Sequence, residues 1–303
     1  MKIFRGFAEV KGIRNPVVTT GSFDGVHIGH KMILNRLRML ADKYDGESVL
    51  ITFDPHPRKV LYPETAGKGL KLINSQEEKL CLLQKAGLDN LIIVEFTRDF
   101  SKTTSEEFVR DYLHGYLKSR VVVVGFNHHF GFNQEGDYRH LWGWREKYGF
   151  EAEEISEQEV QHETVSSTKI RKAISEGYIQ RANAYLDHYY MVMGTPEQNP
   201  EILGFPFYRV PVTEECKLLP ATGIYAVSVT SGDLNSKGMT VITETGGGKV
   251  EVLVHIFDDS EKFKGNPSTL LFHKMIRGAV SLSEAGTARH IMHAKDEISE
   301  LIY

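Results

Sequence analysis

Cysteine is scarce in this chain of 303 residues, and its two copies lie far apart. Only Cys81 and Cys216 are present, which excludes a disulfide framework and a zinc ribbon built on paired cysteines. A reducing compartment is the simpler setting for such a sequence. No apolar run is long enough to span a bilayer, and the opening residues MKIFRGFAEVKG lack the apolar core of a signal peptide. We therefore expect a cytoplasmic protein.

An excess of charge of either sign is also missing. The formal net charge is -4, which gives no global attraction to nucleic acid or to anionic lipid, so a long polyanion is not expected as a partner, although a local basic pocket can still bind phosphates. Hydrophobic residues make up 41% and charged residues 25%, the balance of a globular protein with a normal core. Because 303 residues exceed the usual size of one domain, two domains are expected.

In the first half of the chain, apolar strand-like runs alternate with amphipathic helical stretches. After the β-branched run in NPVVTT, apolar residues recur on one helical face between Ile28 and Tyr44. Further strands are expected at 48–55, 91–96 and 120–126, and further helices at 75–89, with Ser75 as N-cap, and at 105–117. This alternation predicts a doubly wound, Rossmann-like α/β layer whose parallel strands bind ligands beyond their carboxyl ends.

The pattern changes near Tyr190. GIYAVSVTSG, MTVITE and KVEVLVHIFDD are short alternating runs separated by turn residues, which indicates an antiparallel sheet or small β-barrel. The stretch from Ser281 to Ile302 is expected to form a closing helix. We therefore predict an α/β domain over residues 1–189, followed by a small antiparallel β-barrel domain with a C-terminal helix over residues 190–303.

The segment GSFDGVHIGH, residues 21–30, lies where the first strand gives way to a helix. Gly21 and Gly25 permit a tight turn and close approach to a phosphate, and a helix start directs unpaired N–H groups at the anion. His27 and His30 project from one face and can donate hydrogen bonds to a phosphoryl group in its transition state. An ordinary polar helix start or a chance metal pair is the alternative, but the glycine frame favours phosphate chemistry.

A second motif, TFDPHPR, follows the next strand at residues 52–58. Pro55 and Pro57 stiffen the loop and hold His56, with Arg58 as a further candidate, over the same edge of the sheet. On its own the motif fits a rigid strand exit with exposed polar residues equally well.

A third motif, VGFNHHFG, follows a buried strand at residues 124–131. Asn127 offers both a donor and an acceptor, which suits the edge of a planar heterocycle. Phe126 and Phe130 offer apolar contacts, although core packing explains them equally well.

A fourth motif, SSTKIR, places hydroxyl groups at an expected helix start over residues 166–171. Ser166 or Ser167 is expected to cap the helix. Arg171, one turn further on, can hold departing pyrophosphate through bidentate hydrogen bonds.

In this order and at this spacing, the four segments resemble the N-terminal adenylyltransferase domain of the prokaryotic bifunctional riboflavin kinase/FAD synthetase family. The resemblance spans about the first 190 residues, well beyond the H-x-G-H element shared with other nucleotidyltransferases. It implies in-line attack by the phosphate of FMN on ATP, assisted by magnesium that accompanies ATP, with FAD and pyrophosphate as products.

The resemblance also implies roles for individual residues. His27 and His30 would stabilise the transfer state of the α-phosphoryl group, and Arg171 would help to hold the outer phosphates. The other ATP-binding residues would be Gly21, Phe23, Asp24, Gly25, Gly29, Ser167 and Thr168. The flavin-binding residues would be Asp54, Pro55, His56 and Asn127, the last at a position where family members carry Asp or Asn. No metal-ligating residue is identified.

The second half resembles the riboflavin kinase domain of this family much less. The family pattern L-G-F-P-T-A-N reads LGFPFYR here, so Phe207 and Arg209 replace the threonine and asparagine that serve the phosphates and magnesium. The family loop N-x-G-x-R-P-T is replaced around VITETGGG, and the acidic base position falls on Leu253, two residues after Glu251. Because a kinase needs these groups, we expect a barrel without kinase activity that is a structural, flavin-binding or regulatory module.

Three alternatives stay open at this point. A displaced kinase motif would make the chain a fully bifunctional riboflavin kinase/FAD synthetase. Another phosphorylated acceptor, such as phosphopantetheine or nicotinamide mononucleotide, would replace FMN, although VGFNHHFG and SSTKIR argue against it. A flavin- or nucleotide-binding regulator without turnover is the third, and the intact motifs of the first half argue against it.

Overall fold

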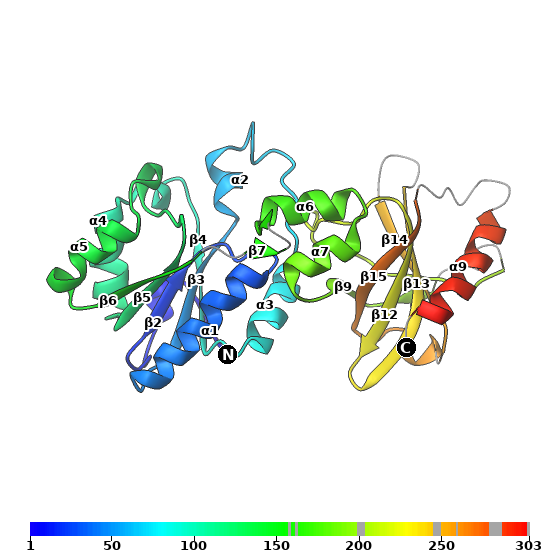
Figure 1. Ribbon diagram of the computed structural model, residues 1–303, viewed down its shortest axis with the longest axis horizontal. Helices are drawn as coiled ribbons and strands as arrows, with labels where there is room; N and C mark the ends of the chain where they lie inside the picture. The colour runs from blue at the N-terminus through cyan, green and yellow to red at the C-terminus, as the bar shows by residue number, and fades with distance from the viewer. Residues whose placement is uncertain are drawn as a thin grey trace. The chain divides into compact units, whose positions relative to one another are not determined.

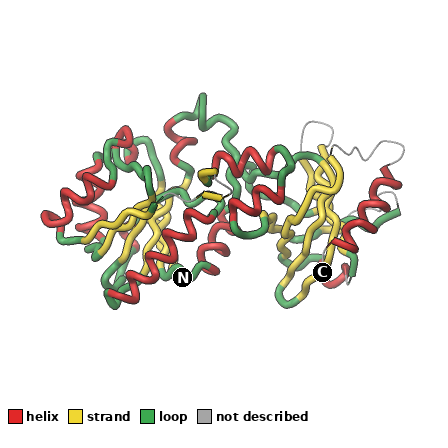
Figure 2. Tube along the Cα trace, in the orientation of Figure 1, coloured by secondary structure: helices red, strands yellow, loops and turns green. Residues whose placement is uncertain are grey.

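The computed structural model describes residues 1–156, 159–160, 163–198, 204–244, 250–258, 260–278 and 287–301. The chain forms two compact units (Figures 1 and 2). The first consists of Met1–Leu70 and Lys79–Val165, and the second of Lys71–Glu78 and Ser166–Tyr303. The division between the compact units therefore falls after Val165, whereas the boundary predicted at 189/190 falls at the first strand of the seven-stranded sheet of the second unit, β9, which begins at Tyr190.

The first unit contains a six-stranded parallel sheet in the order β1-β4-β3-β2-β5-β6. Its strands are β1 (Lys2–Arg5), β2 (Val17–Thr20), β3 (Ser48–Asp54), β4 (Asn90–Glu95), β5 (Val121–Gly125) and β6 (Glu151–Ile155). The strands β2 to β5 are buried over nearly their whole length, which explains why their sequences are mainly apolar and why β5 is continuously so. Successive strands are added in one direction from β2 to β4, and β5 then pairs with the other side of β2. The predicted doubly wound layer is confirmed, with its switch point beside β2 and β5.

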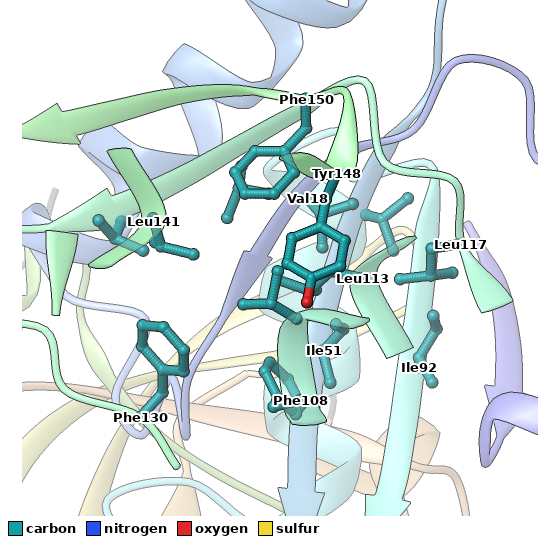
Figure 3. Packing of buried hydrophobic residues seen from close by; sticks show 14 of the residues in the cluster. Val18, Ile51, Ile92, Phe108, Leu113, Leu117, Phe130, Leu141, Tyr148 and Phe150 are labelled. Carbon is teal, nitrogen blue, oxygen red and sulfur yellow. The ribbon is translucent and has the colours of Figure 1, made fainter. Parts of the chain in front are cut away.

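Helices cover both faces of this sheet (Figure 1). Helix α1 (Ile28–Lys43) packs on β2, β3 and β5, and α5 (Tyr138–Tyr148) lies on the other side. The helix expected at 105–117 is a short α4 (Ser105–Glu107) that continues as a π-helix, η3 (Phe108–Tyr116). Figure 3 shows Phe108 and Leu113 of this segment in the core beside the sheet residue Ile51. The apolar pattern of the sequence therefore identifies the buried face of this helix, but it does not show that the helix has the wider turn of a π-helix.

The second unit contains a seven-stranded antiparallel half-barrel in the order β10-β11-β14-β13-β12-β15-β9. Its strands are β9 (Tyr190–Gly194), β10 (Glu197–Gln198), β11 (Tyr208–Arg209), β12 (Gly223–Ser231), β13 (Leu234–Glu244), β14 (Val250–Ile256) and β15 (Ser268–Gly278). The C-terminal helix α9 (Thr287–Leu301) buries Ile291, Ala294 and Ile298 against this sheet. The predicted barrel-like sheet and closing helix are confirmed, while residues 281–286 and 302 of the expected helix lie outside the described residues.

Several short elements complete the two units. They are η1 (Phe7–Glu9), α2 (Pro57–Leu61), α3 (Gln76–Lys85), η2 (Phe100–Lys102), η4 (Phe132–Gln134), β7 (Glu159–Val160), β8 (Glu163–Thr164), α6 (Ser167–Ser175), α7 (Ile179–Leu186) and α8 (Ser260–Phe263). Helix α3 begins in the segment 71–78 that belongs to the second unit, and it continues into the first. The predicted cap is confirmed, because the Ser75 hydroxyl accepts a hydrogen bond from the backbone N–H of Glu78.

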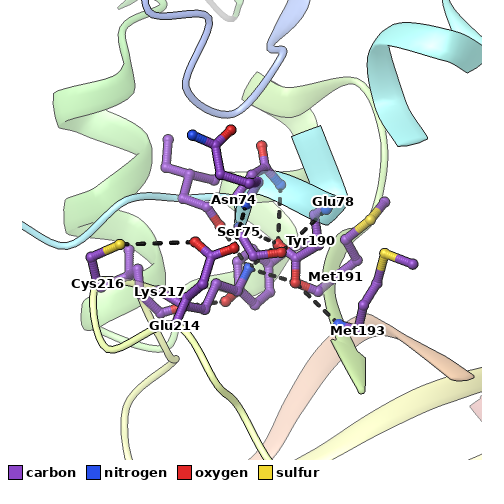
Figure 4. A network of polar contacts seen from close by, with 12 residues as sticks. Asn74, Ser75, Glu78, Tyr190, Met191, Met193, Glu214, Cys216 and Lys217 are labelled. Atoms are coloured by element: carbon purple, nitrogen blue, oxygen red, sulfur yellow. Dashed lines mark hydrogen bonds and ion pairs between the residues drawn. The ribbon is translucent and has the colours of Figure 1, made fainter. Parts of the chain in front are cut away.

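A buried ion pair attaches the segment 71–78 to the rest of the second unit (Figure 4). The ammonium group of Lys217 lies 2.6 Å from Oε2 of Glu78 and also donates to the carbonyls of Ile73 and Met191. Both side chains are buried. Buried charges of opposite sign are tolerated when they are paired and fully hydrogen-bonded, as they are here.

Candidate active site

A cavity of about 170 Å3 opens at the carboxyl ends of the central strands of the first unit. Its wall contains the last residue of β2 (Thr20), the end of β3 (Phe53) and the residue that follows β4 (Phe96). The loop after β5 contributes residues 128–131. Because parallel strands end at one edge of the sheet, side chains distant in sequence meet here. This is the position at which doubly wound sheets bind ligands.

The cavity is mainly apolar and aromatic. Its apolar side chains are Phe53, Pro57, Leu61, Phe96, Phe100, Phe108 and Phe130, and its polar ones are Thr20, Ser101, Thr103, His128, His129 and Gln134. Phe96 contacts both Phe53 and Phe100 in edge-to-face geometry, with ring centroids 5.5 and 5.8 Å apart. These contacts hold the rings in place. An apolar hollow with a few polar groups suits a planar organic ligand.

The glycine motif forms the turn between β2 and α1, directly after Thr20 in the cavity wall. Gly25 adopts φ +92°, a conformation that favours glycine, and the N–H of Gly21 donates to the carbonyl of Ile51 at 3.0 Å. His27 is the N-cap of α1, yet its side chain makes no capping hydrogen bond. The first turn of α1 therefore keeps backbone donors that no cap side chain satisfies, which is the arrangement that binds phosphate.

The two histidines predicted at the phosphate site lie together. Their rings stack with centroids 3.6 Å apart, and Phe23 stacks on the outer side of His30 at 4.4 Å. His27 is buried, whereas His30 is half-buried with its Nδ1 inside and without a hydrogen-bond partner among the described residues. Neither ring belongs to the wall of the aromatic cavity. The aromatic cavity and the histidine stack are thus two distinct parts of one sheet edge.

The environment of His30 favours its neutral form. Burial of the ring lowers its pKa well below the ordinary value, and the charges of His27 and Lys79 lower the pKa further. Lys79 is itself buried and lies 3.5 Å from the hydroxyl of Thr52. Near neutral pH His30 therefore presents one N–H donor rather than a full positive charge.

The residues predicted on the flavin side border the cavity rather than line it. Asp54 ends β3 and is exposed, and its carbonyl accepts a hydrogen bond from Phe96. His56 caps α2, with its Nδ1 accepting from the N–H of Arg58 at 3.2 Å. Asn127 is exposed in a left-handed conformation, directly before the cavity residues 128–131. Contact of Asp54, Pro55, His56 and Asn127 with a ligand stays a prediction.

The predicted outer-phosphate residues lie on α6. Ser166 caps this helix by accepting from the N–H of Lys169 at 3.4 Å, as the motif predicts. Ser167, Thr168 and Arg171 follow in the first turns of α6. Helix α6 belongs to the second unit, and the glycine motif belongs to the first. That these residues meet His27 and His30 in one site stays a prediction.

The described residues form no cluster of metal ligands. Among them, no group of three or more His, Cys, Asp or Glu side chains is arranged to hold a metal ion. Magnesium commonly binds through phosphate oxygens, water and one or two carboxylates, so the predicted Mg2+ would come with ATP and stays a prediction. In the same residues, no helix has the length and apolar character needed to cross a membrane.

The altered kinase positions in the second unit have structural partners. Phe207 is fully buried, with its ring centroid 5.8 Å from that of His255, and Leu253 is buried in the same core. Arg209 forms an ion pair with Glu251 at 3.1 Å. Leu203 and residues 245–248 of VITETGGG lie outside the described residues. Phe207 and Leu253 are thus accommodated in the core, and Arg209 in an ion pair.

Two protein-family models match separate parts of the chain. The FAD synthetase family matches residues 10–169, and the riboflavin kinase family matches residues 189–287. The first match covers the glycine motif, the aromatic cavity and the start of α6. The second covers most of the half-barrel.

Related proteins match both units together. A bifunctional riboflavin kinase/FMN adenylyltransferase from Listeria monocytogenes is 31% identical over 273 residues, which cover 87% of this chain and 84% of the relative. Enzymes of the same name from Escherichia coli and Pseudomonas fluorescens are 28% and 30% identical, each covering 91% of this chain and 90% of the relative. A crystal structure of a macrolide-efflux protein from Streptococcus pneumoniae superposes with a TM-score of 0.87 at 22% identity, covering 99% of both chains. At that identity the superposition supports the fold alone.

Proposed function

The chain belongs to the bifunctional riboflavin kinase/FMN adenylyltransferase family, and on this premise we propose that its first unit transfers AMP from ATP to FMN, forming FAD and pyrophosphate. One observation carries the proposal. A helix start without a side-chain cap, bearing two stacked imidazoles, and an aromatic cavity lie at the same edge of one parallel sheet. Adenylyl transfer to a flavin phosphate needs both parts, one for the triphosphate and one for the isoalloxazine.

The proposed chemistry assigns a role to each part. The backbone donors at the start of α1 bind the phosphates of ATP, and His27 and His30 donate hydrogen bonds to the α-phosphoryl group as charge spreads over its oxygens. The phosphate of FMN attacks in line, and pyrophosphate leaves toward Arg171. No covalent intermediate with the protein is needed. The remaining ATP and flavin residues named from the sequence keep their proposed roles.

An acceptor screen tests this function directly. The protein is incubated with ATP, Mg2+ and, separately, FMN, phosphopantetheine or nicotinamide mononucleotide, and the products are resolved chromatographically. We expect FAD from FMN and no adenylylated product from the other two. Formation of no FAD, with product from another acceptor, would reject flavin as the substrate.

Riboflavin kinase activity is the second candidate function. The family match over 189–287 and the bifunctional relatives favour it. Against it stand the burial of Phe207 and the ion pair between Arg209 and Glu251, which occupy positions where a kinase needs phosphate and metal groups. Loss of kinase activity stays a prediction. Labelled riboflavin with ATP and Mg2+ decides it, because FMN formed at an ordinary enzymatic rate contradicts the loss.

One substitution distinguishes the two hypotheses that the protein is an enzyme or a regulator without turnover. His30→Ala removes one imidazole of the stack. An adenylyltransferase is expected to lose about 100-fold or more in rate, because a single transition-state donor commonly contributes that much. A pure binding protein should keep its function after the same change.

A further inference from the structure

Two polar side chains in the wall of the aromatic cavity, Thr20 and His128, each have a buried atom without a hydrogen-bond partner among the described residues. The imidazole of His128 lines this cavity, and its Nε2 is buried without a hydrogen bond to any described residue. Its ring stacks at a distance on Phe130, with centroids 6.2 Å apart. Unpaired polar groups within apolar surroundings are unfavourable and seldom kept without a reason.

The position and charge of His128 are defined by its surroundings. Its backbone N–H donates to the carbonyl of Gly125 at 3.0 Å, which closes the turn that follows β5. Burial of the ring, with a smaller contribution from the charge of His129, lowers the pKa of His128 to about 4. Near neutral pH the ring is therefore uncharged, with one nitrogen as donor and the other as acceptor.

The proposed substrate has two unlike ends. The dimethylbenzene end of the isoalloxazine is apolar, and the pyrimidine end carries two carbonyl groups and one N–H. The phenylalanine side chains of the cavity suit the apolar end but would leave the polar end without hydrogen bonds. A neutral imidazole can donate to a carbonyl or accept from the ring N–H. The two possible orientations of the flavin therefore differ in hydrogen bonding at this position.

We infer that the imidazole of His128 hydrogen-bonds to the pyrimidine edge of the isoalloxazine and so determines how the flavin is oriented and selected. This inference rests on the proposed function, since it assumes that FMN occupies the aromatic cavity. Adenine is the other planar ligand that the reaction brings to this sheet edge. Removing the imidazole distinguishes the two ligands: affinity for FMN falls if His128 contacts the flavin, and affinity for ATP falls if it contacts adenine.

Two substitutions at His128 and one control test the inference. His128→Phe keeps an aromatic ring but removes both nitrogens, and His128→Gln keeps a donor and an acceptor. His140→Phe is the matched control, because His140 is exposed on α5 and does not line the cavity. The dissociation constant for FMN is measured by flavin fluorescence, and KM for ATP and for FMN is measured in FAD synthesis. Thermal unfolding of each variant is followed in parallel.

We expect His128→Phe to weaken FMN binding about 10-fold, because a hydrogen-bonding group of the ligand then stays unpaired in the cavity. His128→Gln should recover most of that loss, and KM for ATP should stay unchanged. In the wild-type protein, the imidazole 15N resonances of His128 should shift when FMN is added. A residue with only a structural role would lower the unfolding temperature without that shift.

Unchanged FMN affinity in a folded His128→Phe protein would overturn the inference, as would a selective loss of ATP affinity. Absence of the 15N shift would overturn it independently, and this measurement decides the question if His128→Phe does not fold. In each of these cases FAD synthesis by the wild-type protein would leave the proposed function intact. If the wild-type protein neither binds FMN nor makes FAD, the proposed function fails and the inference fails with it.

Discussion

Replacing Lys217 with methionine should destabilise the second unit strongly. The Lys217 ammonium donates to Glu78 at 2.6 Å and to the carbonyls of Ile73 and Met191 at 2.7 and 2.8 Å. Methionine retains much of the apolar stem, but it leaves a buried carboxylate and two buried carbonyls without this donor. Breaking a buried ion pair by removing one partner commonly costs about 3–5 kcal/mol. Glu78 keeps hydrogen bonds from the N–H groups of Ser75 and Met193, so we place the loss at about 3–4 kcal/mol.

The measurement uses thermal and urea unfolding followed by two probes. Both tryptophans, Trp142 and Trp144, lie in the first unit, so tryptophan fluorescence reports that unit while circular dichroism reports both. A loss of this size should lower the midpoint of the second unit by about 10 °C. Lys274→Met is the matched control, because Lys274 forms a half-exposed ion pair with Glu297 at 3.8 Å, and ion pairs in contact with solvent contribute less than about 1 kcal/mol.

A second variant separates the buried charge from lost packing. In Lys217→Met with Glu78→Gln, a neutral amide replaces the buried carboxylate, and its single oxygen can accept from Ser75 or from Met193, which donate to different oxygens of Glu78 in the wild-type protein. We expect this double variant to be more stable than Lys217→Met alone. A loss below about 1 kcal/mol in the single variant would refute the reasoning. Equal stability of the single and double variants would also refute it.

The layers of the fold could be predicted because local pattern and burial agree. The run VVVVG is continuously apolar and SVLITFD is mainly so, because β5 and most of β3 are buried on both faces. Helix starts were signalled by cap residues whose hydrogen bonds are local, such as Ser75 and Ser166. The spacing of His27 and His30 likewise predicted that the two rings would lie together.

Features that depend on long-range packing were not accessible from the sequence. Residues 71–78 belong to the second unit, where Glu78 forms its ion pair with Lys217. Because Lys217 lies 139 positions from Glu78, no local sequence pattern predicts this pairing. The aromatic cavity was also missed, because Phe53, Phe96 and Phe100 meet only when β3 and β4 end at one edge. The sequence signal that could have predicted the cavity is the aromatic residue at the end of β3, Phe53, and the one directly after β4, Phe96. The π-helix was missed because apolar periodicity does not separate its wider turn from an α-helix.

Three further predictions follow from the first unit. Lys79→Met should raise the pKa of His30, because the lysine charge lowers it, and NMR titration of the imidazole checks this. Thr104→Ala should cost about 1 kcal/mol in urea unfolding, since it removes the capping box with Glu107; no change would contradict that role. Finally, the pKa of His128 is about 4 in the folded protein and about 6.5 when unfolded, so between these values the unfolded chain binds more protons. Stability should therefore fall as the pH is lowered from 6.5 to 5, by up to about 2 kcal/mol through this residue. His128→Gln lacks this contribution, and unfolding curves that depend on pH identically in the two proteins would contradict the lowered pKa.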